Sequence, residues 1–479
     1  MTTATTEIPA VEDRASPTIQ AIQAAAGEPS GREAPICTWR PSDAGLECTQ
    51  PVGSGHPFFC ILHNPDEEKD VEEFDRAIKA KIDLEETNPQ LPQVYLSGAV
   101  FPAGSQPLRR AFPKSVNFSW ARFIDQADFR YARFSGDAEF RNVRFGGAAD
   151  FTYTRFGGQA HFWGAEFQGE AAFGGAAFHR EANFGSIRFS HTADFQGTRF
   201  EDNVDFSRSH VEKALTFRHI SFSSRNDDLS VLFQDMVLAN PHAVRFEDMD
   251  LSRVSFLRTD VSQVHFVGCT WGHRADPLLW PLPFRSPKFL SQRRVVLFDE
   301  LDLETPPDMD QAARDRRLVA DLYRQLRQNL ETNRQEAEAG HFYIGQMEMR
   351  RRDPSYPPLY RLMVSVYRIL AMYGESYLRP PLFYLVFGAV AALLYVWGGF
   401  ETAAGTVQLD LTTLGWSQLP EFFRGYVQAL VQALSAVGLI GGVVESTTWW
   451  VPAVYYLNMT LGTFLLGFFA VAVGRHFKR

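Results

Sequence analysis

Phenylalanine recurs through the first half of the chain with a period that fits neither an amphipathic helix nor a flat strand. The spacing alternates between five and six over Phe118, Phe123, Phe129, Phe134, Phe140, Phe145, Phe151, Phe156, Phe162, Phe167, Phe173, Phe178, Phe184, Phe189, Phe195, Phe200 and Phe206. A small residue, most often alanine, stands two positions before most of them. Strict spacing of five follows over Phe246, Leu251, Phe256, Val261 and Phe266. This pattern predicts a coil that returns to the same face after four units, with Phe and the small residue stacked inward.

The units "ADFRYARFSGDAEF" and "ANFGSIRFSHTADF" resemble the pentapeptide-repeat family. The resemblance covers residues 94–271 and implies a right-handed quadrilateral β-helix. The six-residue spacings imply an extra residue at alternate corners, and "SSRNDDLSVLFQDMVLANPH" interrupts the pattern. Such a fold is a scaffold without a cleft or convergent titratable groups, so we expect no enzyme.

Surface charge bears on the partners of this scaffold, because some members of the family are thought to mimic DNA. Residues that precede each Phe point outward, and positions 22 apart share a face. One face then carries Asp128, Asp150, Ala172 and Asp194, the next Arg133, Arg155, Ala177 and Arg199, and the others Glu139, His161, Asn183, Asp205 and Arg122, Arg144, Glu166, Arg188. Alternating stripes are not the single-sign field that mimicry needs, and the net charge of −9 argues against binding nucleic acid. We expect charge pairing within coils, and the stripes leave room for a protein partner.

Four metal-ligating side chains lie close together in residues 36–70, after residues 1–35, which are too poor in apolar side chains to fold. They are Cys37, Cys48, Cys60 and His63. Three thiolates and an imidazole suit a structural Zn²⁺, which would supply folding energy to a short segment. The alternative is three unrelated thiols, because the spacing matches no strict zinc-finger pattern. Cys269 stands alone, and we expect an inert core thiol there.

Residues 305–352 are predicted to form a cytosolic helical connector. Leu318, Leu322, Leu326 and Leu330 follow one another at intervals of four, which is typical of one helix face. Asn333 or Gly340 is expected to end or bend the helix and give a hairpin. This hairpin would either cap the β-helix or pack against its copy in an oligomer.

Two uncharged segments, 382–400 and 451–474, are long enough to span a bilayer. Residues 357–378, with arginines among apolar residues, predict an amphipathic helix in the interface. Basic residues flank both spans on one side: Arg350, Arg351, Arg352 and Arg379 precede the first, and Arg475, Lys478 and Arg479 follow the second. This distribution places both termini in the cytoplasm of a multi-pass protein of a bacterial inner or plasma membrane. Trp397, Trp449 and Trp450 are expected at the outer interface.

Residues 422–446 combine a short apolar helix with the stretch "SAVGLIGGVVESTTWW". This arrangement resembles the two-transmembrane potassium-channel pore module, with a pore helix and a re-entrant filter loop. The resemblance implies a pore lining at Ser435, Val437, Gly438, Leu439, Ile440, Gly441, Gly442 and Glu445. Ala436 and Leu439 replace the threonine and aromatic residue of the family filter, so we expect altered or relaxed selectivity. On the second span Asn458, Gly462 and Gly467 are candidates to line the conduit, or to serve tight helix packing.

The sequence therefore predicts a mixed fold: a β-helix, a helical connector and a two-helix transmembrane pore domain. The function that we expect is an oligomeric, tetrameric ion channel that conducts monovalent cations with relaxed selectivity. The alternative is a membrane-anchored scaffold, or an effector that depolarises the membrane, with a degenerate pore that is closed or opens only when triggered.

Overall fold

The computed structural model describes residues 37–38, 48, 59–66, 68–105, 108–222, 230–277, 291–302, 309–402, 405–407, 419–435, 446 and 448–477. The chain divides into two compact units, Met1–Pro65 and Asp66–Arg479. The predicted unfolded residues 1–35 lie outside the described part. The four predicted metal ligands fall in the first unit, and all helices and strands discussed below belong to the second.

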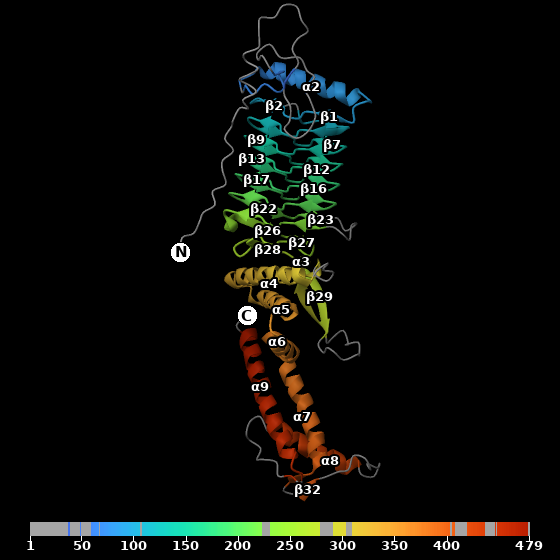
Figure 1. Cartoon of the computed structure of the whole chain (residues 1–479), viewed down its shortest axis with the longest axis vertical. Helices are drawn as coiled ribbons and strands as arrows, with labels where there is room; N and C mark the ends of the chain where they lie inside the picture. Colours follow the sequence, from blue (N-terminus) through green and yellow to red (C-terminus); the bar gives the residue numbers. More distant parts are fainter. Residues whose placement is uncertain are drawn as a thin grey trace, which may run out of the picture. The chain divides into compact units, whose positions relative to one another are not determined.

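The repeat forms a parallel β-solenoid of four sheets, which confirms the predicted four-sided β-helix (Figure 1). The first sheet contains β1 (Gln93–Tyr95), β4 (Ser115–Asn117), β8 (Ala138–Glu139), β12 (Ala160–His161), β16 (Ala182–Asn183), β20 (Val204–Asp205), β24 (Val231–Leu232) and β27 (Val254–Ser255). The second contains β6 (Ala127–Asp128), β10 (Ala149–Asp150), β14 (Ala171–Ala172), β18 (Ala193–Asp194), β22 (Leu215–Arg218), β26 (Val244–Glu247) and β28 (His265–Val267).

The other two sheets complete each coil. The third contains β3 (Ala111–Phe112), β7 (Arg133–Phe134), β11 (Arg155–Phe156), β15 (Ala177–Phe178), β19 (Arg199–Phe200) and β23 (Ser221–Phe222). The fourth contains β2 (Val100–Phe101), β5 (Arg122–Phe123), β9 (Arg144–Phe145), β13 (Glu166–Phe167), β17 (Arg188–Phe189), β21 (His210–Val211) and β25 (Val237–Leu238). A short 3₁₀ helix, η1 (Pro241–Ala243), precedes β26.

Each residue pairs with the residue one coil further along. Ala149 pairs with Ala127 and Ala171, and Phe156 pairs with Phe134 and Phe178, so the register advances by 22 residues. This register confirms the four predicted faces. It shortens to 20 between Phe246 and Phe266, where the spacing is strictly five.

The core of the solenoid consists of phenylalanine columns. Phe162 is fully buried, and its ring stacks on those of Phe140 and Phe184, with centroids 4.7 and 5.0 Å away. It also meets Phe151 and Phe173 edge to face at 5.4 and 5.6 Å. Offset stacks along a column and T-shaped contacts between columns are the favourable arrangements of aromatic rings. The coil spacing of about 4.8 Å suits both.

Two kinds of corner alternate around each coil. After Phe118 the chain makes a tight turn in which Ala121 N–H donates to Phe118 O at 2.9 Å and Trp120 has a positive φ of 64°. Equivalent positive-φ residues recur every 11 residues, at Tyr131, Asn142, Tyr153, Gly164, Gly175, Ser186, Gly197, Arg208 and His219. The left-handed residue lets the chain turn in a five-residue unit, as in a type II turn. At the other corners the predicted extra residue makes the turn.

Charged side chains on the solenoid pair with one another. Arg130 pairs with Asp128 in its own coil at 2.7 Å, while Arg144 pairs with Glu166 of the next coil at 3.3 Å. The expected pairing within coils is therefore only part of the pattern, because the register also brings opposite charges together between coils.

Helix α2 (Val71–Thr87) covers the first coil, a feature that the repeat pattern did not predict. Phe74, Ile78 and Ile82 are fully buried, and the Phe74 ring meets Phe101 edge to face at 5.4 Å. The carboxylate of Glu85 accepts a 2.7 Å hydrogen bond from Tyr95 N. Asp70, which caps the helix by accepting from Glu73 N, and the spacing of the three apolar residues were the available signals.

The other end of the solenoid is covered by the connector. The hairpin β29 (Gly272–Pro277) and β30 (Ser291–Val296) leads to α3 (Phe298–Asp302), α4 (Met309–Thr332) and α5 (Glu336–Arg352). Asn329 Nδ2 on α4 donates to Val261 O and Val264 O at 2.8 and 2.6 Å, and Val261 N donates to Gln325 at 3.1 Å. These bonds satisfy backbone groups at an open end that another chain could otherwise extend. The helix hairpin therefore caps the solenoid, one of the two predicted arrangements.

The bend in the connector follows Thr332, so Asn333 marks it and Gly340 does not. Gly340 lies inside α5, where it is buried. Arg334, with a φ of 60°, makes the turn between the helices.

Four helices follow the connector: α6 (Pro358–Ala371), α7 (Arg379–Gly398), α8 (Leu419–Ser435) and α9 (Val451–Phe477). The 3₁₀ helix η3 (Met372–Gly374) separates α6 from α7, and the strands β31 (Phe400–Thr402) and β32 (Gly405–Val407) lie between α7 and α8. The predicted interface helix 357–378 is therefore shorter, because Met372 and Tyr373 adopt left-handed φ values of 49° and 60° and break it. Helix α7 begins at Arg379 rather than residue 382, since proline is well suited to the first helical turn.

The phenylalanine columns should dominate the stability of the solenoid. Replacing the buried Phe162 with alanine is expected to lower the free energy of unfolding by about 3–5 kcal/mol. Tyr131→Ala, at an exposed corner, should cost about 1 kcal/mol or less. Urea unfolding followed by circular dichroism checks both values, and equal losses in the two variants would contradict this account of the core.

Candidate metal centre and membrane segment

Cys37, Cys48, Cys60 and His63 converge in the first unit. Their ligand atoms all lie within 4.8 Å of one another. Cys48 Sγ lies 3.8 Å from Cys60 Sγ, and His63 Nδ1 lies 3.5 Å from Cys37 Sγ and 3.2 Å from Cys60 Sγ. Tetrahedral ligands held about 2.3 Å (sulfur) and 2.0 Å (nitrogen) from an ion would be separated by about 3.8 and 3.5 Å. The cluster therefore has the donor set and dimensions to hold a metal ion.

A turn of the backbone brings two of these ligands together. His63 N–H and Asn64 N–H both donate to Cys60 O, at 3.1 and 2.9 Å, so residues three apart face the same side. Cys37, Cys60 and His63 are buried, and Cys48 is half-buried. Hydrogen bonds from Cys48 and Cys60 lower the pKa of the Cys37 thiol far below its usual value and outweigh the effect of burial. A thiolate is the form that binds metals.

Cys269 is separate from this cluster. It lies on the solenoid, where it is half-buried and its Sγ donates to Phe246 O at 3.2 Å. Burial raises the pKa of its thiol to about 11, so it stays protonated and unreactive near neutral pH.

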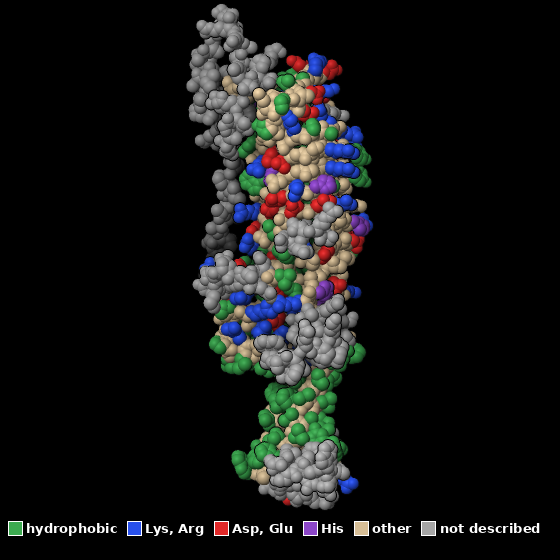
Figure 2. Space-filling model, turned by 90° about the vertical axis from the view of Figure 1, so that its right-hand side faces the viewer, with side chains coloured by type: hydrophobic (Ala, Val, Ile, Leu, Met, Phe, Trp, Pro, Cys, Tyr) green, Lys and Arg blue, Asp and Glu red, His purple; other side chains and the backbone are tan. Residues whose placement is uncertain are grey.

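Helices α7 and α9 expose apolar side chains over most of their length. Among the described residues, Arg379–Gly398 and Val451–Arg475 are long and apolar enough to cross a membrane. Only 33% and 22% of the residues in their most apolar stretches are buried. A core helix of a water-soluble protein would be mostly buried. Figure 2 shows hydrophobic side chains covering this segment, in contrast to the mixed charges of the solenoid. These features are compatible with association with a membrane.

The C-terminal end of α7 and the N-terminal end of α9 lie next to each other. The rings of Trp397 and Trp450 are 5.6 Å apart, and Thr448 Oγ1 donates to Gly398 O at 2.9 Å. Ser446 forms an antiparallel bridge with Phe400. The tryptophans that the sequence placed at an interface therefore cluster at the same end of the helix pair.

Helix α8 ends further along the helix pair, away from these tryptophans. Tyr384 Oη on α7 donates to Leu434 O at 2.5 Å, and Asn458 Nδ2 on α9 donates to Ala433 O at 2.8 Å. These carbonyls belong to the last turn of α8, where the carbonyl groups have no hydrogen-bond donors within the helix. Gly388, halfway along α7, permits this approach, because a Cβ there would lie 2.8 Å from Leu434. The C-terminal end of α8 is thus fixed beside the middle of α7.

The predicted pore residues have different locations. Ser435 ends α8, and its hydroxyl donates to Gln432 O at 3.0 Å. Val437, Gly438, Leu439, Ile440, Gly441, Gly442 and Glu445 lie outside the described residues. On α9, Asn458 and Gly462 are buried, whereas Gly467 is exposed and nothing lies within 4 Å of where its Cβ would be.

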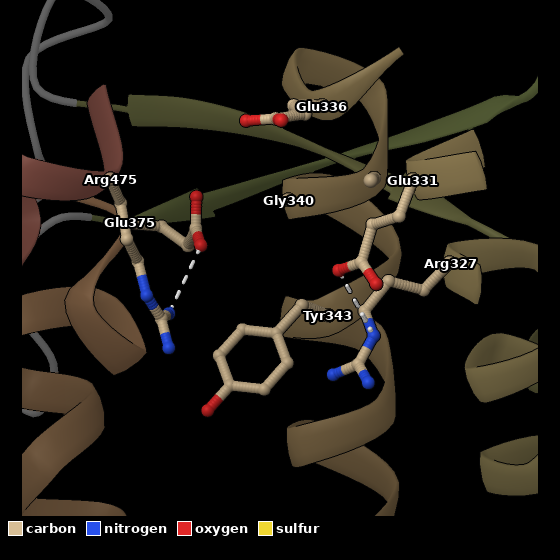
Figure 3. A pocket seen from close by; sticks show the side chains of 8 residues that line it. Arg327, Glu331, Glu336, Gly340, Tyr343, Glu375 and Arg475 are labelled. Carbon is tan, nitrogen blue, oxygen red and sulfur yellow. Dashed lines mark hydrogen bonds and ion pairs between the residues drawn. The ribbon is translucent and has the colours of Figure 1, made fainter. Parts of the chain in front are cut away.

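The last turn of α9 meets the connector. Arg475 Nη1 donates to Tyr373 O at 3.1 Å and to Glu375 at 3.3 Å. Figure 3 shows the ring of Tyr343 between the guanidinium groups of Arg475 and Arg327, which lie 4.9 and 5.4 Å from its centroid. A cavity of about 370 Å³ opens beside them. The C-terminal end of α9 is therefore held by a cation–π contact to Tyr343 of the connector and by hydrogen-bonding and ionic contacts to Tyr373 and Glu375.

A buried carboxylate, Glu348 of α5, joins the connector to α6 and η3. Arg351 and Arg368 lie 2.8 and 2.7 Å from its oxygens, and Tyr373 Oη donates to it at 2.7 Å. Burial alone would raise the pKa of Glu348, but the charge and hydrogen bond of Arg351, with help from Arg368 and Tyr373, lower it overall. Glu348 is therefore ionised at neutral pH.

Arg352 extends this network towards the solenoid. It lies 3.7 Å from Glu348 and 3.6 Å from Glu300 of α3. Glu300 accepts two hydrogen bonds from the fully buried Arg294, at 2.6 and 2.8 Å, and one from Tyr323. In the sequence, Arg350, Arg351 and Arg352 were interpreted only as charges flanking a membrane span. Arg351 and Arg352 also pair with Glu348, and their intervals of three and four residues from it were the signal.

Removing the charge of Glu348 should uncouple the connector from α6. Glu348→Gln removes the buried charge and leaves the half-buried Arg351 and Arg368 without their partner, so it is expected to cost about 3 kcal/mol of unfolding free energy at pH 7. Because the pKa of Glu348 is lowered in the folded protein, this stabilisation is present above the ordinary glutamate pKa of about 4.3 and is lost as the pH falls below it. Glu331→Gln, in a more exposed pair with Arg327, should cost less than about 1 kcal/mol. Denaturant unfolding in mild detergent at pH 7 and pH 4 gives the comparison, and a Glu348 effect that does not shrink at pH 4 would be inconsistent with it.

The comparison with known proteins concerns the solenoid. The family model for pentapeptide repeats (9 copies) matches residues 129–177 and 173–221. No curated protein and no solved structure matches the chain. The matched residues carry the 22-residue register and the phenylalanine columns described above. The chain therefore contains a pentapeptide-repeat β-solenoid, a scaffold, joined to a helical segment with two apolar helices.

Proposed function

We propose that the chain is one subunit of an oligomeric, tetrameric membrane channel that conducts monovalent cations with relaxed selectivity. Helices α7 and α9 cross the bilayer, and the solenoid and connector form a cytoplasmic scaffold. The observation that carries this proposal is the position of the C-terminal end of α8 along the helix pair. Its C-terminal end is hydrogen-bonded beside the middle of α7, while Ser446 bridges Phe400 at the end of α7. We assign the chain no enzymatic activity.

The end of α8 lies beside the middle of α7, whereas Ser446 lies beside the end of α7, and this difference in position supports a re-entrant segment. The chain descends along α8 to the middle of the helix pair and is back at the tryptophan-rich end by Ser446. Backbone that is not helical or paired is tolerated at membrane depth only where it is buried in protein or lines a cavity. The C-terminal end of a helix also carries partial negative charge, which favours cations.

Several copies are needed to enclose such a segment. In one chain, Phe423, Val427 and Val431 of α8 and Leu457 and Phe464 of α9 remain exposed. Neighbouring copies in a ring would cover these faces, and Gly467 would allow close packing of α9 or face the conduit. Basic residues at the start of α7 and the end of α9 favour a bacterial inner or plasma membrane with both termini in the cytoplasm.

Zinc is the metal that best suits the cluster of the first unit. Three thiolates and one imidazole are a typical structural zinc set with no position left open for catalysis. We expect the purified chain to carry about one zinc per subunit by plasma mass spectrometry. Cys60→Ser should lose it, because it removes one thiolate of the cluster. Cys269→Ser, a thiol outside the cluster, should retain it. Absence of zinc from the wild type, or equal zinc in both variants, would refute this assignment.

Ion flux through the purified protein in liposomes tests the channel. Wild type is expected to dissipate a potassium or sodium gradient, and Gly438→Ala/Gly441→Ala should reduce the flux at least tenfold, because methyl groups would block carbonyls from turning towards an ion. Gly474→Ala, where nothing lies within 4 Å of the added carbon, is the matched control. No flux from a well-folded wild type would reject conduction. The alternative would then be favoured: a membrane-anchored scaffold with a closed pore, whose solenoid binds a protein partner.

A further inference from the structure

A second cavity lies in the connector, near the start of α6. Its volume is about 240 Å³, and it is lined by residues from α4, α5 and the link that follows α5. Four arginines contribute to the lining: Arg316, Arg317, Arg324 and Arg350. The acidic residues of the lining are Asp321 and Asp353, so the wall has an excess of two positive charges.

Only two of the four arginines are paired. Arg317 Nε lies 3.2 Å from Asp353, and Arg324 donates to Asp321 at 2.5 and 3.0 Å. Arg316 and Arg350 make no hydrogen bond or ion pair within the part of the chain that the structure describes. They come from different helices and line the same cavity. The cavity therefore offers two guanidinium groups to an anion.

An uncovered apolar surface begins beside this cavity. Tyr356, part of the lining, stacks on Tyr360 in the first turn of α6, with centroids 5.0 Å apart. Along α6, Leu359, Leu362 and Met363 are 69%, 59% and 63% exposed. The opposite face, with Val364, packs against α5. A basic cavity next to an exposed apolar helix face is the arrangement expected where a protein meets the surface of a membrane.

We propose that this cavity binds the phosphate group of an anionic lipid, with the lipid tails along the exposed face of α6. Arginine suits phosphate because its planar fork donates two parallel hydrogen bonds to phosphate oxygens. The place of α6 in the chain, separated from α7 only by η3 and a short link, favours a lipid over a soluble anion, and to that extent the inference rests on the membrane location proposed above. A phosphate between Arg316 and Arg350 would tie both connector helices to the bilayer.

Binding can be measured on the full-length chain in neutral detergent by isothermal titration with short-chain lipids. The wild type is expected to bind dihexanoyl phosphatidylglycerol and to bind dihexanoyl phosphatidylcholine at least tenfold more weakly. Arg316→Gln/Arg350→Gln should weaken binding of phosphatidylglycerol about 30-fold, given a typical contribution for each arginine near an anionic lipid surface. Arg314→Gln/Arg334→Gln removes the same charge from exposed positions outside the cavity and should leave affinity within twofold. Arg350→Glu, a single change, should abolish binding and serves as a second test should the double variant fold poorly.

Three results would overturn the proposal: equal affinity for both lipids, equal weakening by the cavity and control variants, or inorganic phosphate binding as tightly as phosphatidylglycerol. The last result would identify the ligand as a soluble anion. The titration needs neither an intact bilayer nor conduction, so it can succeed where liposome flux fails. Loss of flux with binding intact would therefore reject the channel alone, and loss of binding with flux intact would reject the lipid site alone.

Discussion

Stacking of phenylalanine on phenylalanine at the repeat distance of the coil is the constraint on which the solenoid depends. A ring at one position fixes the same position one coil away, because the column tolerates neither a gap nor a lateral shift. Where the spacing alternates between five and six, the 22-residue register follows, and with it the placement of the outward-facing charges. Opposite charges on neighbouring coils therefore meet as a consequence of the core rather than as its cause.

A solenoid built in this way has two open ends, and the chain covers both with helices. Helix α2 presents a row of apolar residues to the first coil, and α4 presents Asn329 and Gln325 to backbone groups of the last. The second cap also belongs to the connector, whose buried carboxylates Glu300 and Glu348 lead in short ionic steps to α6 and η3. Movement of the solenoid would therefore be transmitted to the helices beyond it through groups that are costly to separate.

The repeat was predictable from sequence almost to the residue, because each position is specified many times over by its equivalents in other coils. The four metal ligands were predictable as a set, since few residue types bind metals and they stand close together in the chain. The place where α8 ends along the helix pair was not predictable, because it depends on contacts of Tyr384, Gly388 and Asn458 with residues of α8 that are distant from them in sequence. The same holds for Glu348, whose partners come from three elements. Of the two positions predicted for the bend, Gly340 was wrong, because a small buried residue in a helix can serve close packing as well as a bend.

The alternating corners of the solenoid bear on how such a chain evolves. Each coil contacts only the coil before and the coil after it, and each coil of 22 residues contains two left-handed corners and two longer ones. Duplication or loss of one whole coil preserves the columns, the corners and both caps. The distance between α2 and α4 is thus adjustable in steps of about 4.8 Å. The number of coils therefore sets the separation of the two capping helices, and it changes only by whole coils.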